Sequence, residues 1–396
     1  MIMINAKAQP LQDRWKKCGE NNLEIYKDKL TACVQKVKRN IDIIGEASPG
    51  ECIIDGQYKL IENNVWTTGF YPGMLWLAYT VTGDECFLKA GKKQTESFRN
   101  RYKTDCEMDN HDIGFCYSLS AVADYIMTGD ENARELAIDA AYKMSELYMH
   151  KAGVINRGGG YSTKDAETEM FIIDCMNDIP LLFWASKVTG DKALYEMAYN
   201  HAKNSTELLI LPCGAACHVG IAEIKSGRLH RDMERSQGKG GSDAIWSRAQ
   251  AWAVAGLPIA YGYTKDERFL EAAKKAANFF LNSMPEDMVA PWDLYYTDNE
   301  TQKDTSASAI AVCGLLELIQ YVNEEEAEIY LGAANKIIKA LIDGYMVDSD
   351  EDNMGILTGA TCNFRANRGV NVPNVYGDYY FMEALCRLTQ QYKRFW

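Results

Sequence analysis

One helical pattern recurs along the chain and constrains the fold more than any other feature of the sequence. Each copy has an apolar stretch with helical spacing, a tight turn, and a second stretch that is apolar on one face. Each copy is therefore expected to form a hairpin of two helices. The copies span residues 76–98, 121–148, 181–209, 254–284 and 311–342; the fourth has Lys265 in place of the turn glycine, and the fifth has a different turn.

The turn between the two helices reads Thr-Gly-Asp in the first three copies. Glycine accepts the left-handed conformation that ends a helix, and aspartate caps the helix that follows. The first helices, such as 253–261 and 308–316, are apolar nearly all round, as buried inner helices are. The second helices carry one apolar stripe, as at positions 272 to 281, which is typical of outer helices.

A sixth hairpin is expected to join the segment 377–392 to a helix near 21–43. Six hairpins with buried inner helices predict an all-α fold of the (α/α)6 barrel type, and an open solenoid is the alternative. We expect one domain over 1–396, with an N-terminal segment 1–20 that is not necessarily regular. The inserts before the inner helices are expected to be irregular and to gather on one face: 44–66, 150–170, 212–245, 285–306 and 350–376.

Composition restricts where the protein works and what it binds. The chain has 47% hydrophobic and 24% charged residues, without the long apolar run of a membrane helix. Its first residues show no cleavable signal, so we expect a cytoplasmic protein, although export without such a signal stays open. The formal net charge of −13 argues against nucleic acid and anionic membranes as partners, but not against a small anionic substrate.

The twelve cysteines are spread evenly, and most lie in apolar helical patterns, so we expect reduced, buried thiols. Cys213, Cys217 and His218 form the one cluster that resembles a metal site. No second pair follows at ligand spacing, so we expect neither a metal nor another cofactor.

Unusual side chains precede the inner helix in each hairpin. If the repeat is real, they converge on one axis. Aromatic rings stack on sugar faces, amides and arginine fix hydroxyl groups, and two carboxylates in an apolar cavity suit acid/base chemistry. The sequence therefore predicts a sugar site. These residues are Trp66, Phe70, Tyr71, His111, Asp112, Asp174, Asn177, Asp178, Asp243, Trp246, Arg248, Gln250, Trp252, Trp292, Asp293, Asp304, Tyr376 and Asp378.

Structural interpretations compete with the functional ones at four of these positions. Asp112 is well placed to be a helix N-cap, and we expect it both to start an inner helix and to face the pocket. Asp174 could be the buried partner of an arginine. Arg248 could pair with another residue, and Asp304 before Thr-Ser-Ala-Ser is expected to be an N-cap.

Five motifs, in this order, resemble those of the unsaturated glucuronyl hydrolases, glycoside hydrolase family 88: "NVWTTGFYPGMLWLAY", "NHDIGFCY", "IIDCMNDIPLLFWA", "WSRAQAW" and "GDYYFMEAL". The resemblance runs from about residue 60 to 390. It implies an (α/α)6 barrel that acts on the oligosaccharides released by polysaccharide lyases. Such an enzyme hydrates the C4=C5 double bond of the unsaturated uronic acid, and the resulting hemiketal opens and expels the remaining sugar.

The resemblance also implies roles for single residues. Asp174 matches the acid/base, and Asp112 matches its partner, which orients the substrate or stabilises positive charge. The arginine is the natural partner of the uronate carboxylate. The substrate-contacting positions match Trp66, His111, His218, Gln237, Trp246, Arg248 and Trp252.

Several points stay open at this stage. The segment between Gln237 and Trp246 is one residue longer than the expected pattern, and no Lys/Ser arrangement fixes a preference for sulfated sugars. The alternatives are an unsaturated rhamnogalacturonyl hydrolase acting on pectin fragments, a sugar 2-epimerase and a non-catalytic helical scaffold. An oligosaccharide partner and a monomer or homodimer are expected.

Overall fold

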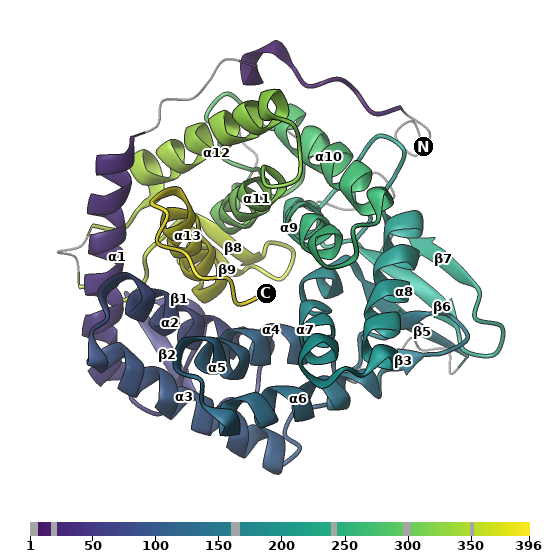
Figure 1. Ribbon diagram of the computed structural model, residues 1–396. Coiled ribbons are helices and arrows are strands. Elements are labelled where there is room, and N and C mark those ends of the chain that lie inside the picture. The colour runs from purple at the N-terminus through teal and green to yellow at the C-terminus, as the bar shows by residue number, and fades with distance from the viewer. Residues whose placement is uncertain (1–6, 17–21, 160–166, 239–243, 296–301, 349–351) are drawn as a thin grey trace.

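The structure is a computed structural model and describes residues 7–16, 22–159, 167–238, 244–295, 302–348 and 352–396. Its helices form two concentric rings (Figure 1). The inner ring comprises α2 (Phe70–Thr82), α4 (Ile113–Tyr117) with α5 (Ala123–Thr128), α7 (Pro180–Thr189), α9 (Ser247–Thr264), α11 (Thr305–Leu318) and α13 (Val375–Leu388). The outer ring comprises α1 (Leu23–Ile44), α3 (Glu85–Lys103), α6 (Glu131–Ser145), α8 (Lys192–Leu209), α10 (Glu267–Asn282) and α12 (Glu324–Tyr345).

The inner helices pack against their neighbours in chain order, and α13 returns to α2, so the inner ring is closed. A π-helical turn, Ser118–Val122, joins α4 to α5. The predicted sixth hairpin is confirmed, because α1 lies outside α13 and packs against it. The sequence pattern explains the two rings: every residue of α11 is buried, whereas α10 buries only one face.

The turns have the predicted chemistry. Gly83, Gly129 and Gly190 have φ values of 66°, 73° and 81°, and Lys265 takes the same left-handed place with a φ of 55°. After each of these turns an aspartate side chain accepts a hydrogen bond from the first turn of the outer helix. The capping aspartates are Asp84, Asp130, Asp191 and Asp266.

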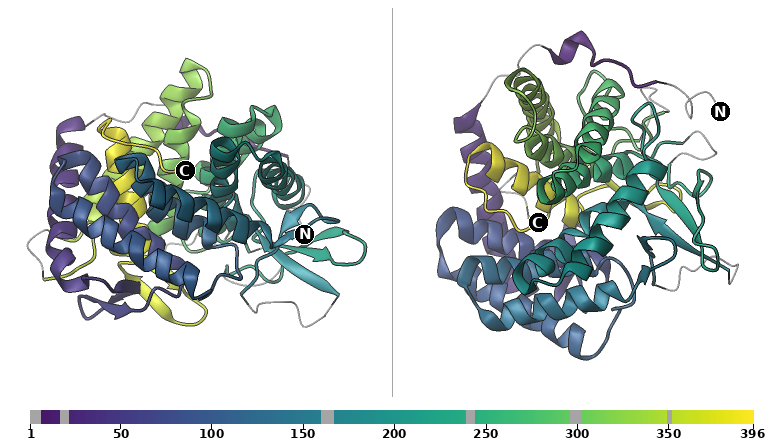
Figure 2. Two further views of the ribbon diagram at one scale, coloured as in Figure 1. Left: turned by 60° about the horizontal axis from the view of Figure 1, so that its bottom comes forward. Right: turned by 45° about the vertical axis from the view of Figure 1, so that its right-hand side comes forward.

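The inserts were expected to be irregular, but most of them contain short antiparallel strands. These are β1 (Ser48–Ile54) with β2 (Gln57–Ile61), β3 (Tyr148–Met149) with β4 (Val154–Ile155), β5 (Thr168–Ile172) with β6 (Val219–Glu223) and β7 (Leu229–Asp232), and β8 (Ala360–Asn363) with β9 (Arg368–Val372). Asp55 and Gly56, both at positive φ, make the tight turn of the first hairpin. Figure 2 shows the hairpins gathered toward one end of the helical ring.

The N-terminal residues 7–16 cross the outside of the ring (Figure 1) and are anchored by Trp15. This side chain is fully buried, and its indole N–H donates to the carbonyl of Leu281 on α10. No helix among the described residues is both long and apolar enough to span a membrane. Of the described cysteines, all are free thiols and most are buried, whereas Cys18 lies outside the described residues.

Candidate active site

A cavity of about 970 Å³ opens between the strand hairpins and the ends of the inner helices. All nine residues to which the family resemblance assigns a role line this one cavity: Trp66, His111, Asp112, Asp174, His218, Gln237, Trp246, Arg248 and Trp252. They come from four different hairpins of the repeat. Equivalent positions in the repeat explain why residues so distant in sequence meet here.

Asp112 immediately precedes α4, as predicted, but its side chain does not cap the helix. Its backbone is already helical, with φ −62° and ψ −7°, whereas a capping residue is usually extended, and its carboxylate accepts no hydrogen bond from the N–H groups of α4. The expectation that Asp112 caps this helix is therefore wrong. The carboxylate is 24% exposed and lies 3.9 Å from Nε2 of His111 in the cavity wall.

The neighbouring His111 contacts Asp178, one of the predicted mouth residues, for which the sequence indicates no role. Nδ1 of His111 lies 2.6 Å from Oδ2 of Asp178, and the other carboxylate oxygen accepts from the backbone N–H of Phe115 at 2.8 Å. Asp178 is fully buried. A Cβ at Gly114 would lie only 2.2 Å from its Cα, so a glycine is required for this close approach.

The electrostatic surroundings of His111 favour the imidazolium. Burial disfavours a charged ring, but attraction to Asp112 and Asp178 and the hydrogen bond to Asp178 outweigh it, and the pKa of His111 lies well above 6.5. These contacts therefore favour the positively charged form of His111 beside Asp112.

Asp174 lies in the helical turn Ile173–Asn177, which follows β5 directly. Its side chain is 16% exposed in the cavity, and Oδ1 lies 3.3 Å from Nε2 of His218. The alternative that Asp174 is the buried partner of an arginine is wrong, because its near neighbour is this histidine. Burial acts to raise the pKa of Asp174, but His218 and His111 together hold it below the ordinary value of 3.8.

Arg248 lines the same cavity and is almost fully buried. Its Nη1 donates to Asp304 at 2.5 Å and to the carbonyl of Thr361 at 2.7 Å, and its Nη2 donates to the carbonyl of Cys362 at 2.8 Å. Asp304 caps α11 as predicted, through the backbone N–H of Ser306. Arg248 is thus a pairing residue, as the structural alternative held. Asp304 already balances the positive charge that the resemblance assigns to the uronate carboxylate.

Aromatic rings surround this arginine. The guanidinium lies 4.5 Å from the ring centroid of Trp246, 5.4 Å from that of Trp292 and 5.0 Å from that of Tyr376. The ring of Tyr376 in turn lies 5.0 Å from Trp66. The indole N–H of Trp246 has no hydrogen-bond acceptor among the described residues, which leaves it available to a ligand.

The segment that carries Gln237 passes beside the same wall. Its backbone carbonyl accepts from the indole N–H of Trp292 at 3.0 Å, and the residue lines the cavity. Asp243, also predicted at the mouth, lies outside the described residues. Cys213, Cys217 and His218 do not form a metal-ligand group in the part of the chain that the structure describes, where His111, Cys175 and Asp178 are the group close enough to do so.

The cavity lining carries a charge opposite to that of the whole chain. It includes six lysine or arginine side chains against four carboxylates. The basic residues are Lys59, Arg101, Arg157, Arg235, Arg248 and Arg368. In a chain of net charge −13 this local balance favours an anionic ligand.

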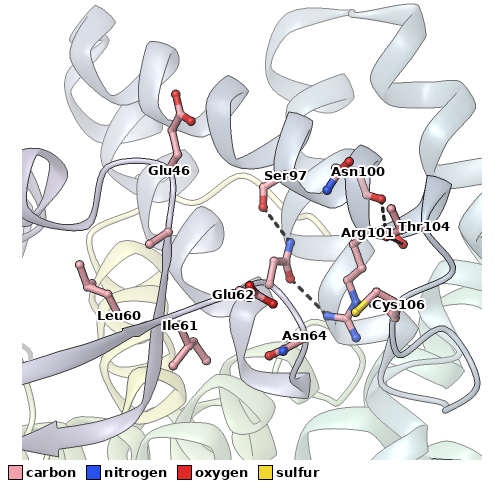
Figure 3. Close-up of a pocket in the computed structure, with 12 residues that line it drawn as sticks. Glu46, Leu60, Ile61, Glu62, Asn64, Ser97, Asn100, Arg101, Thr104 and Cys106 are labelled. Atoms are coloured by element: carbon pink, nitrogen blue, oxygen red, sulfur yellow. Dashed lines mark hydrogen bonds between the residues drawn. The ribbon is translucent and has the colours of Figure 1, made fainter.

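A second cavity, of about 610 Å³, lies beside the first, between β2 and the end of α3. Figure 3 shows the strand residues Leu60 and Ile61 on one side of this cavity, and Ser97 and Asn100 of α3 with the following Thr104 on the other. Arg101 lines both cavities but is almost fully buried, and it donates to backbone carbonyls such as that of Val65. The second cavity contains none of the nine predicted residues.

Comparison with known proteins finds relatives that match most of the chain. The sequence profile described as Glycosyl Hydrolase Family 88 matches residues 50–392. An unsaturated chondroitin disaccharide hydrolase of Streptococcus pneumoniae is 35% identical over 390 residues, which cover 96% of this chain and 98% of the relative.

Two solved structures resemble the whole fold. The unsaturated glucuronyl hydrolase of Streptococcus agalactiae has a TM-score of 0.92 and 32% identity, with 100% of both chains covered. The unsaturated glucuronyl hydrolase of Bacillus sp. GL1, described as responsible for the degradation of glycosaminoglycan, has a TM-score of 0.88 and 34% identity. That match covers 92% of this chain and 96% of the other.

Proposed function

The chain belongs to Glycosyl Hydrolase Family 88, and from this premise we propose how its cavity works as the active site of an unsaturated glucuronyl hydrolase. The enzyme is a glycosidase that releases 4,5-unsaturated glucuronic acid from the non-reducing end of glycosaminoglycan-type oligosaccharides. The single observation that carries the assignment of the site is the convergence of Asp112, Asp174 and seven further predicted residues on one cavity. The comparisons do not favour a pectin-specific hydrolase, an epimerase or a scaffold.

The architecture that supports this site is, we infer, an (α/α)6 barrel in one domain. The closed inner ring and the pairing of each inner helix with an outer one support this reading over an open solenoid. The cytoplasmic location expected from the N-terminal sequence stays a prediction.

In the proposed reaction Asp174 gives a proton to C4 of the unsaturated sugar. The double bond between C4 and C5 is a vinyl ether, so protonation at C4 leaves positive charge shared by C5 and the ring oxygen. Water then adds to C5, and Asp174, now a carboxylate, accepts the proton from this water. The hemiketal formed at C5 opens and releases the remaining sugar, so no covalent sugar–enzyme bond is needed.

This role requires Asp174 to be protonated when the substrate is bound, although its pKa is low in the free protein. The carboxylate of the unsaturated sugar brings a negative charge into the cavity, and the sugar ring excludes water. Both changes raise the pKa of a neighbouring carboxyl group. Proton uptake by Asp174 is therefore coupled to substrate binding.

The carboxyl group of Asp112 lies beside His111, and we place it next to the positive charge that develops at C5 and the ring oxygen. His111 and the basic side chains of the wall offset the charge of the uronate. The indole N–H of Trp246 is available to a sugar hydroxyl, and the rings of Trp66 and Trp252 supply apolar faces.

An activity panel tests the proposed function. We expect the ultraviolet absorbance of the C4=C5 bond to disappear when the protein meets unsaturated disaccharides from chondroitin or hyaluronan, sulfated or not, and to persist with unsaturated disaccharides from pectin. Consumption of the pectin products alone would favour the rhamnogalacturonyl alternative. No consumption of any of them would contradict the assignment.

Replacing Asp178 by asparagine is expected to lower kcat about 10- to 100-fold, the usual effect of losing a carboxylate that orients a functional histidine. The pKa of His111 is raised in part by Asp178, so wild type loses its imidazolium only as pH rises through that raised value. In D178N this pKa falls, and the alkaline limb of the pH–rate profile moves to lower pH.

The matched control is D124N, because Asp124 is also a buried carboxylate but lies on α5 and hydrogen-bonds to Thr128. D124N is expected to keep the wild-type pH–rate profile. A D178N profile that coincides with that of wild type would exclude a positioning role for Asp178.

A further inference from the structure

Two thiols from distant parts of the sequence meet in the wall of the site cavity. Cys52 lies on β1 and Cys362 on β8, and both residues line the cavity. Neither thiol has a role in the proposed reaction. The sequence pattern predicts buried, apolar thiols, but Cys52 is only half-buried.

Gly369 on β9 makes room for this pair. A Cβ at Gly369 would lie 2.8 Å from Sγ of Cys362 and 2.9 Å from Sγ of Cys52, so the two sulfur atoms pack over the same bare backbone position. The φ of Gly369 is +54°, which also favours glycine. Any other residue here would push the two sulfur atoms away.

The two thiols also influence one another electrostatically. Interaction with the thiol of Cys362 is the largest influence that lowers the pKa of Cys52. The guanidinium of Arg368 acts in the same direction. The half-buried Cys52 is therefore the nucleophile of the pair, and the buried Cys362 is its neighbour within reach.

We propose that Cys52 and Cys362 form a modification site in the cavity wall, which low-molecular-weight disulfides oxidise reversibly to an intramolecular disulfide, with loss of sugar turnover. The pair was assembled by the fold, because 309 residues separate the two cysteines and three strands bring them together. The effect on turnover rests on the proposed function. The thiol chemistry does not.

Oxidation takes place in two exchange steps. The Cys52 thiolate attacks one sulfur of a disulfide RSSR, a mixed disulfide forms on Cys52, and one RS⁻ leaves. Cys362 then loses its proton and attacks Sγ of Cys52, which forms the internal disulfide and releases the second RS⁻. The two protein thiols lose two electrons and two protons, and RSSR gains them as two RSH.

The position of Cys362 explains why the disulfide changes activity. Its carbonyl accepts a hydrogen bond from Arg248, and Arg248 packs against the rings of Trp246 and Tyr376. A disulfide ties β1 to β8 and draws the two sulfur atoms to bonding distance. A shift of β8 displaces the carbonyl of Cys362, and with it Arg248 and the rings of Trp246 and Tyr376 that pack on Arg248.

The test compares fully reduced protein with protein treated with oxidised glutathione. We expect non-reducing digestion and mass spectrometry to find a peptide pair linked through Cys52 and Cys362. Turnover of an unsaturated chondroitin disaccharide should fall about tenfold or more, since small displacements of substrate-binding groups have effects of this size. A reductant should restore it.

Two variants sharpen the result, each measured against its own reduced form. C52S should give no linked peptide and no change in turnover on oxidation. C86S removes a thiol that is also half-buried but lies at the start of α3, outside the cavity, and should respond as wild type does.

A stable glutathione adduct on Cys52 without the linked peptide would show that the two thiols do not form an intramolecular disulfide. A linked peptide with unchanged turnover would show that the disulfide does not affect activity. If the reduced protein does not consume the disaccharide, the proposed function fails. In that case the linked peptide still shows whether Cys52 and Cys362 form a disulfide, and its absence would overturn the thiol proposal.

Discussion

Replacing Asp174 by asparagine is expected to lower turnover of unsaturated chondroitin disaccharide by about 10²- to 10⁴-fold, the range for loss of a general acid/base. An amide neither donates the proton to C4 nor accepts one from the attacking water. Substrate binding should persist, because asparagine keeps the size of the side chain. The measurement is kcat under saturating substrate, with substrate affinity determined separately by calorimetry.

The D174N variant should fold as wild type does, since Asp174 caps no helix and its side chain remains partly exposed in the cavity. Its unfolding temperature checks this point. D191N serves as the control, because Asp191 caps α8 at the surface and asparagine caps equally well. A D174N protein with wild-type turnover would exclude Asp174 as the acid/base.

Replacing Arg248 by methionine is expected to lower the free energy of unfolding by about 3–5 kcal/mol, the cost of breaking a buried ion pair from one side. Asp304 is fully buried and would lose its charged partner. The carbonyls of Thr361 and Cys362 would also lose a donor. Denaturant unfolding of wild type and R248M measures the difference.

The double variant R248M/D304N tests the cause of this loss. Because it removes the buried negative charge as well, it should recover part of the stability that R248M loses. R268M is the matched surface control, as Arg268 pairs with Asp266 while 47% exposed, and should cost no more than about 1 kcal/mol. If R248M and R268M lowered the free energy of unfolding equally, burial would not make the Arg248–Asp304 pair more important for stability than a surface pair.

Much of the helical framework could be predicted from sequence because its determinants are local. The helical spacing of apolar residues and the Gly-Asp turn both act within one hairpin, so the residues of that hairpin determine its helices and its turn. Lys265 shows that the pattern tolerates one departure, since lysine takes the left-handed conformation where the other turns use glycine. The strands were missed, although Asp55-Gly56 between two short alternating stretches is a hairpin signal.

The convergence of seven residues from equivalent repeat positions on one cavity could also be predicted, because such positions face the same axis. His218 and Gln237 came from the family resemblance alone. The pairings within the site could not be predicted. His111 meets Asp178, and Arg248 meets Asp304, across 67 and 56 residues. No local pattern encodes such partners, since each depends on how two separate hairpins pack. The capping role expected of Asp112 failed for a related reason: its backbone is already helical, which local sequence does not reveal.

The closure of the inner ring by α13 has a consequence for synthesis on the ribosome. The carbonyls that hold Arg248 lie on β8, and the helix that seals the ring against α2 follows β9. Earlier hairpins can form as soon as they emerge, because their contacts are local. The site cavity, by contrast, is completed only after α13 has been translated. A nascent chain can therefore be helical long before it can be catalytic.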